Sequence, residues 1–492
     1  MLLLFLLAGW GFQFAKQAFF PSSNLPMFYL EYRMPMGSDI RSTSEAGEDI
    51  EAYIQSLNNV EFVSTTVGRG AARFMLTYPM EMNYSNYGQL IIRMKDKESI
   101  VPAIKQVRHY MTQQQPSIES KITRVDIGPA TGSKIEARFT GVDPVVLRQL
   151  SDQAKAILRA DSGTMNVTDD WKNQTKVIRP IFNTTAAREV GITKQDVDNL
   201  LLTNYLGRTV GVYRDGTERL PILVRLPADE RKTINTLEDM QIYSPVLRQY
   251  LPIKQVVSEF KVEFEDPVIK RRDRKRMLTV MADNDMLSEE TAEQLFNRIR
   301  PQIENLSLPA GYELTWGGEY ESKNNAQGPI FGSLPLGYGV MFIITILLFN
   351  SIKLATVIWT TVPLAIIGVS LGFVVTGIPF GFMSLLGLLS LSGMLIKNGI
   401  VLVEQIKLEF AEGREYMDAI VHASVSRVRP VAMAAITTVL GMAPLLADDF
   451  FKSMAVVIMF GLSFATVLTL FVVPVMYSLL IKPEQTEADN TN

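Results

Sequence analysis

Five apolar segments close the chain, and each is long enough to cross a lipid bilayer as a helix. A bilayer core of about 30 Å is spanned by about 20 helical residues. Such segments occupy residues 331–350, 355–376, 382–404, 430–447 and 453–481. The sequence Thr-Gly-Ile-Pro at 376–379 separates the second segment from the third. Residues 331–481 are therefore predicted to form five transmembrane helices, followed by a cytoplasmic tail at 482–492.

The first residues, MLLLFLLAGWGFQFAKQAFF, form a shorter apolar run that Lys16 interrupts. A secretory signal is the alternative interpretation, but no basic residue precedes the run and no small-x-small cleavage site follows it. We therefore expect residues 1–20 to be a partial transmembrane helix whose beginning is missing. Such a start predicts that the chain is a fragment or a gene half.

Charge predicts the orientation of these segments. The connection at 405–429 contains several basic residues, whereas the one before the last segment contains Asp448, Asp449 and only Lys452. Because basic connections favour the cytoplasmic side, residues 405–429 are expected to be a cytoplasmic loop. Counting the crossings backward places the polar residues 21–330 outside, in the periplasm of a Gram-negative cell, and the chain in its inner membrane.

Residues 21–330 repeat the order strand, helix, strand. Each repeat consists of a strand-like run, a helical run and a second strand-like run. In that order the runs occupy residues 27–34, 42–57 and 60–67; 89–96, 98–113 and 122–128; 134–142, 144–160 and 164–170; and 276–283, 288–306 and 311–320. This alternation predicts an α+β fold of split β-α-β sandwiches, with helices on one face of each sheet. The predicted parts are 21–132, then 133–174 with 263–330, and an inserted domain at 175–262.

Composition excludes several classes of function. The chain of 492 residues has a net charge of -3, no cysteine and two histidines. A nearly balanced charge argues against nucleic-acid binding, which depends on neutralising phosphates. The lack of cysteine removes disulfides, thiolate catalysis and cysteine metal sites. His109 and His422 are too far apart to predict a metal site, and no phosphate-loop signature is present. We expect no cofactor and no enzymatic activity.

The segment GMLIKNGIVLVE places Lys397 and Asn398 among apolar residues. A lysine at the centre of a transmembrane helix costs about 2.5–3.5 kcal/mol, although one near an end can reach the interface. Small and polar residues share a helical stripe with this lysine: Gly387, Ser390, Gly393 and Glu404. Because small residues let another helix approach closely, this stripe is expected to face protein. No other segment contains an acidic partner, so the counter-charge is expected from another polypeptide or a missing half.

Several segments of the chain resemble a known family of membrane proteins. The runs SGMLIKNGIVLVEQI and RVRPVAMAAITTVLGMAPLL resemble the tenth and eleventh transmembrane helices of resistance-nodulation-division (RND) efflux permeases, particularly the hydrophobe/amphiphile exporters. FFPSSNLPMFYLEYRMPMGSDIRST resembles the start of the family's second periplasmic loop, and AAREVGITKQDVDNLL and IKRRDRKRMLTVMAD resemble the segments that lead into and out of its docking domain. The matches run in order from about residue 17 to 480. The family protein has two such halves, and this chain resembles only the second.

The resemblance implies a proton relay. In these pumps the lysine of the Lys-Asn motif pairs with aspartates of the first half, and protonation of the aspartates drives alternating access. Lys397 and Asn398 match this motif. The family's threonine on the next helix corresponds to Ala434, so Thr437 and Thr438, one turn further, are the expected substitutes.

The resemblance also implies a porter region of two sandwiches, at about 27–130 and 134–325, with a docking domain inserted in the second. Substrate is expected to pass through a cleft between the sandwiches, where Phe62, Val67 and Ile91 are the expected lining. Family members are homotrimers of complete units that work in the bilayer with a periplasmic adaptor and an outer-membrane channel. The expected function is proton-driven export of hydrophobic or amphiphilic compounds, in partnership with the missing N-terminal half.

Three alternatives stay open. Several methionines of the first sandwich could form the relay of a copper or silver exporter, because thioethers suit Cu(I), although core packing is the preferred interpretation. They are Met27, Met34, Met36, Met75, Met80 and Met82. A non-transporting accessory membrane factor would share the span count, but would lack the insertion at 175–262. The third alternative is a gene remnant.

Overall fold

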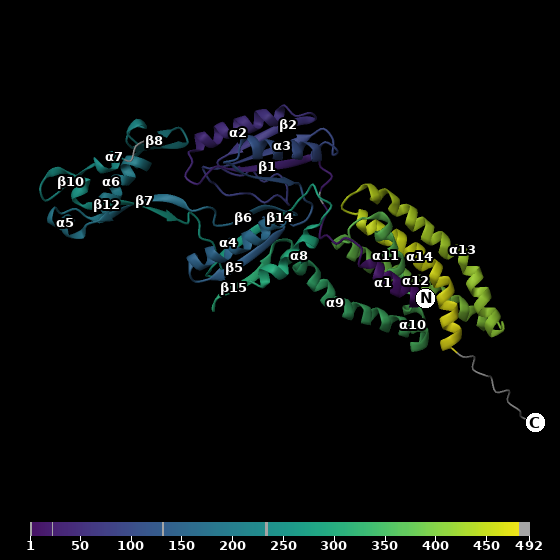
Figure 1. Cartoon of the computed structure of the whole chain (residues 1–492). Coiled ribbons are helices and arrows are strands. Elements are labelled where there is room, and N and C mark those ends of the chain that lie inside the picture. The colour runs from purple at the N-terminus through teal and green to yellow at the C-terminus, as the bar shows by residue number, and fades with distance from the viewer. Residues whose placement is uncertain (1, 22, 130–131, 232–234, 482–492) are drawn as a thin grey trace, which may run out of the picture. The chain divides into compact units, whose positions relative to one another are not determined.

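The structure is a computed structural model that describes residues 2–21, 23–129, 132–231 and 235–481. The cytoplasmic tail predicted at 482–492 lies outside the described residues. The chain divides into two units, which are described separately: residues 1–172 with 268–492, and residues 173–267. Figure 1 labels the helices and strands along the chain.

The first sandwich contains one sheet and two helices. Its elements are β1 (Met27–Arg33), α2 (Ile40–Gln55), β2 (Val60–Val67), β3 (Tyr87–Met94), α3 (Ile100–Gln114) and β4 (Glu119–Arg124). The sheet is antiparallel, with the strand order β2-β3-β1-β4. This order of strands and helices is the split β-α-β arrangement that the sequence predicts.

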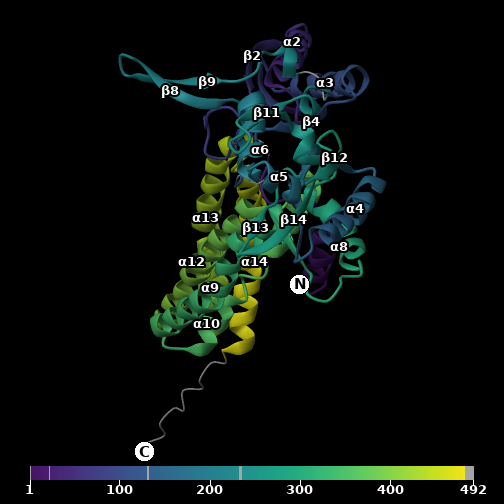
Figure 2. The same cartoon turned by 90° about the vertical axis from the view of Figure 1, so that its left-hand side faces the viewer.

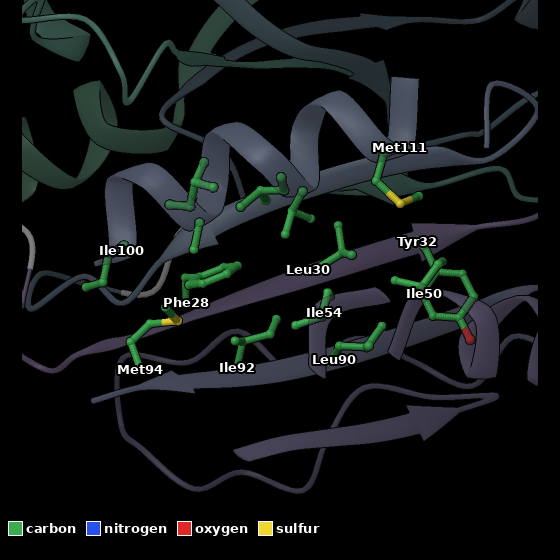
Figure 3. Close-up of a cluster of buried hydrophobic side chains, with 14 of the residues drawn as sticks. Phe28, Leu30, Tyr32, Ile50, Ile54, Leu90, Ile92, Met94, Ile100 and Met111 are labelled. Carbon is green, nitrogen blue, oxygen red and sulfur yellow. The ribbon is translucent and has the colours of Figure 1, made fainter. Parts of the chain in front are cut away.

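Alternation along the strands explains which face the helices cover. Phe28, Leu30 and Tyr32 of β1 point to the same face and are fully buried beneath α2 and α3 (Figure 3). Burying each such side chain contributes about 1.5–3 kcal/mol. Asp39 fixes the start of α2 because its carboxylate accepts a hydrogen bond from the Arg41 backbone N–H at 2.8 Å. The sandwich therefore has a core of its own.

The second sandwich repeats this arrangement with a different connection. Its elements are β5 (Ile135–Gly141), α4 (Pro144–Ala160), β6 (Thr164–Asp169), β13 (Arg271–Arg272), β14 (Lys275–Asn284), α8 (Ala292–Glu304) and β15 (Glu313–Gly317). The strand order is β13-β14-β5-β15, and β6 also pairs with β14. The α4 helix has the predicted bounds because Asp143 caps it and Pro144 occupies its first turn.

Residues 173–267 form the second unit, where the sequence predicts an insertion at 175–262. Its elements are β7 (Thr175–Phe182), α5 (Thr184–Glu189), α6 (Lys194–Leu201), β8 (Arg208–Asp215), β9 (Glu218–Val224), α7 (Asn235–Glu238), β10 (Gln241–Ser244), β11 (Gln249–Pro252) and β12 (Val257–Glu265). The strands form three antiparallel pairs: β7 with β12, β8 with β9, and β10 with β11. Ile253 and Val256 lie in its core, which is separate from those of the sandwiches.

The remaining elements are apolar helices: α1 (Leu2–Phe12), α9 (Gly318–Phe349), α10 (Ile352–Trp359), α11 (Ala365–Thr376), α12 (Phe382–Ala411), α13 (Tyr416–Met442) and α14 (Lys452–Leu480). Within the described part of the chain, four helical stretches are long and apolar enough to cross a membrane; they begin at residues 318, 382, 416 and 452. About half of the residues in the apolar stretches of α12 and α14 are buried, but few of those in α9 and α13. Figure 2 shows α12, α13 and α14 side by side.

Two boundaries differ from the sequence prediction. The span predicted at 355–376 is two helices, α10 and α11, because Pro363 lacks a backbone N–H and interrupts regular helical bonding between them. The predicted cytoplasmic loop at 405–429 is wrong in its extent. The amphipathic residues on both sides continue as α12 and α13, and only residues 412–415 connect them, with Gly413 at a φ of +87°.

Candidate functional site

Lys397 lies on the outer side of α12. Its neighbours Leu395, Ile396 and Gly399 are buried within the helical bundle, whereas the Lys397 side chain is exposed and Asn398 is half-buried. Among the described residues, no ion pair or hydrogen bond joins the Lys397 ammonium to another group. The part of the chain that the structure describes therefore provides no counter-charge for this lysine.

The predicted small and polar stripe is exposed along most of its length. Ser390, Gly393 and Glu404 are exposed on the same side of α12 as Lys397, and a Cβ atom at Gly393 would meet no atom within 4 Å. Gly387 is the exception, because there the stripe faces protein within this chain, as the sequence analysis expects. It is buried against Met454 of α14, where a Cβ atom would approach the methionine side chain to 3.1 Å. The stripe is open from Ser390 onward and allows close approach of another helix.

Thr437 and Thr438 are not brought to Lys397. The Thr437 hydroxyl donates to the Met433 carbonyl at 2.9 Å, and the Thr438 hydroxyl donates to the Ala434 carbonyl at 2.8 Å. Both bonds lie within α13. Their place in a proton relay stays a prediction.

Polar contacts that the sequence analysis missed tie α12 to its neighbours. Ser392, which is buried, lies 3.0 Å from the Tyr338 hydroxyl of α9. Near the far end of α12, the buried Glu409 carboxylate lies 3.0 Å from Nδ1 of His422 on α13, and it also pairs with Arg414 at 2.7 Å. The only sequence signal for these contacts is the polar content of the amphipathic residues around 405–429.

The start of α12 is bound to the segment that follows α1, residues 13–21, here called the connector. The Phe382 backbone N–H donates to the Phe19 carbonyl at 3.1 Å, and the Phe380 N–H donates to the Lys16 carbonyl at 2.7 Å. Gly381 is required by this approach, because a Cβ atom there would lie 2.9 Å from the Ala18 carbonyl oxygen. The helix that carries Lys397 therefore begins in direct contact with the connector.

A cavity of about 450 Å³ lies between the two sandwiches. Its lining is mostly polar and includes Glu31, Arg33, Glu119, Lys121, Asp170 and Lys172. Burial raises the pKa of Glu31, although Lys121 opposes the shift. Burial, with Arg33 nearby, lowers the pKa of Lys172. A second cavity of about 270 Å³ is lined by Asp126, Lys134, Asp283 and Glu319, among others.

Two ion pairs cross from one sandwich to the other beside the larger cavity. Lys121 Nζ of β4 lies 3.2 Å from Asp283 Oδ2 of β14, and Arg108 of α3 lies 3.0 Å from Oδ1 of Asp285. Burial alone would raise the pKa of Asp283, but Lys121 and the Lys134 backbone N–H hold it below the ordinary value. The two sandwiches are therefore joined by charges on either side of a cleft.

The residues predicted to line this cleft do not share one face. In the pairing of β2 with β3, Phe62 lies opposite Arg93 and Ile91 lies opposite Ser64, on the face away from the helices. Val67 has the opposite parity along β2 and lies on the helix-covered face. Ile91 packs in a small cluster with Tyr29 and Tyr78. The described structure thus brings Phe62 and Ile91 to one side of the sheet, but not Val67.

The methionines of the first sandwich are dispersed. Met34 packs against the sandwich core, Met27 and Met75 pack in the small cluster with Tyr29, and Met80 and Met82 are exposed. Within the described residues, no group of three or more histidine, cysteine, aspartate or glutamate side chains could hold a metal ion.

Long apolar helices, with a lysine on the open face of one of them, are typical of a membrane protein that has a functional site on its helical part. The chain belongs to the AcrB/AcrD/AcrF family of RND permeases, whose sequence profile matches residues 1–481. Members are multi-pass proteins of the inner membrane with a periplasmic domain, and they are transporters rather than enzymes.

Three known proteins illustrate the similarity. The chain is 25% identical to the nickel and cobalt resistance protein CnrA of Cupriavidus metallidurans, with 96% of this chain and 45% of CnrA covered. It is 26% identical to the cobalt-zinc-cadmium resistance protein CzcA of the same organism, with 73% and 34% covered. The crystal structure of a heavy metal efflux pump matches with a TM-score of 0.82 at 20% identity, with 97% of this chain and 49% of that chain covered. The chain spans about half the length, or less, of these proteins.

Proposed function

We propose that this chain is the second half of a proton-driven RND efflux permease that exports metal cations. The observation that carries the proposal is Lys397, an ammonium on an apolar helix whose open, small-residue face has no partner in the described chain. A cation in this setting needs a counter-charge. A carboxylate on a helix of the first half, docked along Ser390, Gly393 and Lys397, would supply it.

The relay follows from elementary electrostatics. A carboxylate beside Lys397 is held ionised, because an opposite charge within a few ångströms favours its charged form. Protonation from the periplasmic side removes that charge, releases the lysine and lets α12 shift relative to the first half. Asn398, half-buried beside it, is the neighbour that this movement affects first.

The proposed cargo differs from the cargo that the sequence analysis expected. The resemblance favoured hydrophobic or amphiphilic compounds, whereas the names of CnrA, CzcA and the matched pump concern metals, which favours the alternative of cation export. The lining of the cleft argues against a hydrophobic cargo, because it is mostly polar, but its charged groups include basic ones such as Arg33 and Lys172 as well as acidic ones. The thioether ligands that suit Cu(I) are dispersed here, which gives no support to a copper or silver form of this alternative.

Assembly belongs to the same proposal. We expect homotrimers of complete units, a periplasmic adaptor and an outer-membrane channel, with residues 173–267 as the docking domain that contacts the adaptor or channel side. This inserted unit is also the feature that favours a transporter over an accessory membrane factor. We expect no nucleic acid in this assembly.

Efflux by cells that produce both halves tests the proposal. Lys397→Met should reduce export of Ni²⁺, Co²⁺, Zn²⁺ or Cd²⁺, each tested singly, to the level of cells without the pump, while the amount of protein in the membrane is unchanged. Lys353→Met is the matched control, because Lys353 is exposed at the start of α10. Retained export in Lys397→Met would refute the relay. Export of amphiphilic dyes but of no metal would restore the first expectation about cargo.

A further inference from the structure

Glu319, in the first turn of α9, connects segments that are far apart in the sequence. Its backbone N–H donates to the Lys134 carbonyl at 2.9 Å, and its Oε1 accepts from the Phe19 backbone N–H at 3.1 Å. Its Oε2 lies 3.8 Å from the Lys134 ammonium, and only 16% of the Glu319 side chain is exposed. A carboxylate buried to this degree requires such partners. They come from the residue before β5 and from the connector.

Lys134 extends these contacts into the cleft. Its backbone N–H donates to Asp283 Oδ1 at 2.8 Å, and the other oxygen of Asp283 pairs with Lys121 on the cavity wall. The Lys134 ammonium also pairs with Asp126. Although burial opposes the charge, Asp126 and Glu319 hold the pKa of Lys134 above the ordinary lysine value. Lys134 therefore stays cationic across the pH range of the periplasm.

The connector extends the contacts in the other direction. Phe19 donates its N–H to Glu319 and accepts the N–H of Phe382, the first residue of α12, at its carbonyl. The Phe19 and Phe382 rings also meet edge to face, with centroids 6.1 Å apart. Since α12 carries Lys397, an unbroken series of contacts joins the helix of the proposed relay to the wall of the cleft.

The surroundings of Glu319 leave room for rearrangement. Glu319 and Lys134 line both the cavity of about 270 Å³ and a smaller one of about 80 Å³. The charged groups that face the pair are Asp126, Asp283 and the ion pair between Glu293 and Lys323. A close-packed interior resists displacement, so hollow space on two sides of an ion pair is where movement costs least.

We propose that Glu319 is a positioning residue that couples the movement of α12 to the opening and closing of the cleft. The inference rests on the proposed transport function, because it assumes that α12 moves when Lys397 gains or loses its partner. Glu319 touches neither substrate nor the transferred proton. It passes the displacement of the connector to Lys134, and through Lys134 to Asp283. Such a path needs a demonstration of coupling beyond its continuity in space.

Hydrogen exchange on the purified chain in lipid nanodiscs tests the contacts directly. Glu319→Ala should accelerate exchange about tenfold or more at the Phe19 amide, because its hydrogen bond to a charged acceptor is lost. Exchange at the Phe382 amide should also accelerate, because this amide donates to the carbonyl of the released Phe19. The matched control is Glu289→Ala. Glu289 also binds the connector, through Lys16 at 2.9 Å, but is 93% exposed, and an ion pair of this kind contributes little. Unchanged exchange at Phe382 in Glu319→Ala would overturn the inference. Glu319→Met, which keeps much of the side-chain length but has no oxygen to accept the Phe19 N–H, replaces the alanine variant if the alanine variant does not fold.

Transport by cells that produce both halves gives the second measurement, with Ni²⁺, Co²⁺, Zn²⁺ and Cd²⁺ tested singly. Glu319→Gln should lower the maximal export rate about tenfold while the half-saturating concentration is unchanged, since substrate contacts are intact. Lys134→Arg, which keeps the charge, should retain most of the rate, and Glu289→Ala all of it. A changed half-saturation with an unchanged maximal rate would overturn coupling. If the wild-type pump exports none of these cations, the proposed function fails, and the exchange experiment still decides the contacts.

Discussion

The two α/β sandwiches bury their apolar side chains within themselves, whereas the helical bundle leaves many of its apolar side chains exposed. In the first sandwich, the apolar faces of β1, α2 and α3 are buried against one another, and Phe28 is 0% exposed. In the bundle, α9 and α13 leave most of their apolar side chains uncovered, and Val421 is 57% exposed. The sandwich therefore buries the apolar side chains that stabilise it, whereas the bundle leaves apolar surface that lipid or another protein surface would cover.

The largest expected effect sharpens this contrast. Phe28→Ala should destabilise the chain by about 3–5 kcal/mol, because it removes a fully buried ring and leaves a cavity. Val421→Ala, on the open face of α13, should change stability by less than about 0.5 kcal/mol. Thermal unfolding in lipid nanodiscs, followed by circular dichroism, checks both. Equal losses in the two variants would break the comparison and mean that the face of α13 is covered.

The next effect concerns the charges that join the sandwiches. Lys121→Met should destabilise the periplasmic region by about 2–4 kcal/mol, near the lower end of the range for a broken buried pair because 20% of the Lys121 side chain is exposed. Lys95→Met, at an exposed lysine of the same sandwich, is the control. Loss of protection from hydrogen exchange along β4 and β14 measures the change. An equal loss of protection in Lys95→Met would contradict the view that the pair of Lys121 with Asp283 joins the two sandwiches.

The pH dependence of that variant follows from Asp283. Its folded pKa lies below the unfolded value of about 3.9, so its stabilising contribution is present above that pH and is lost as the pH falls through the folded pKa. Without Lys121, burial dominates and the pKa of Asp283 rises. The stability deficit of Lys121→Met should therefore shrink as the pH is lowered from about 7 to about 5. A deficit that is constant over this range would show that Lys121 has another role.

The smallest effect compares two glycines of α12. Gly393→Ala should stabilise this chain by up to about 1 kcal/mol, because alanine favours a helix and no atom lies near the added Cβ. Gly387→Ala should destabilise it, since Met454 is already in contact. In the complete permease the gain at Gly393 should be lost if a first half docks there. Thermal unfolding with and without that half separates the two cases.

Features that depend on a local sequence pattern could be predicted more readily than contacts between residues that are far apart in the sequence. The strand β2 has the predicted bounds, because alternation over Val60–Val67 is a local pattern. The exposed Lys397 was predicted to lack a partner in this chain, because charge in an apolar segment is also visible locally. The interruption between α10 and α11 was missed because hydropathy alone set that boundary, although Pro363 is a local helix breaker. The pairing of Lys121 with Asp283 depends on how two sandwiches pack, which no local pattern contains.

The sequence prediction of the cargo was limited in a different way. The Lys-Asn motif led to the exporters of amphiphilic compounds, yet under the proposed function that motif would serve the driving ion rather than the cargo. The cleft that would hold the cargo is built from Glu31, Lys121 and other residues of separate strands. A motif proposed to serve the driving ion therefore says little about the cargo.

The length of α9 has a mechanical consequence. Its 32 residues form a single helix that contains Pro329 and Pro335, and at 1.5 Å per residue this helix is about 48 Å long. Its first residue, Gly318, is held so closely against the Lys134 carbonyl that a Cβ atom there would lie 2.7 Å from the oxygen. With one end fixed in this way the helix acts as a lever: a tilt of roughly 5° at the sheet would move the opposite end by about 4 Å. Small adjustments in the periplasmic region would thus be magnified at the far side of the bilayer.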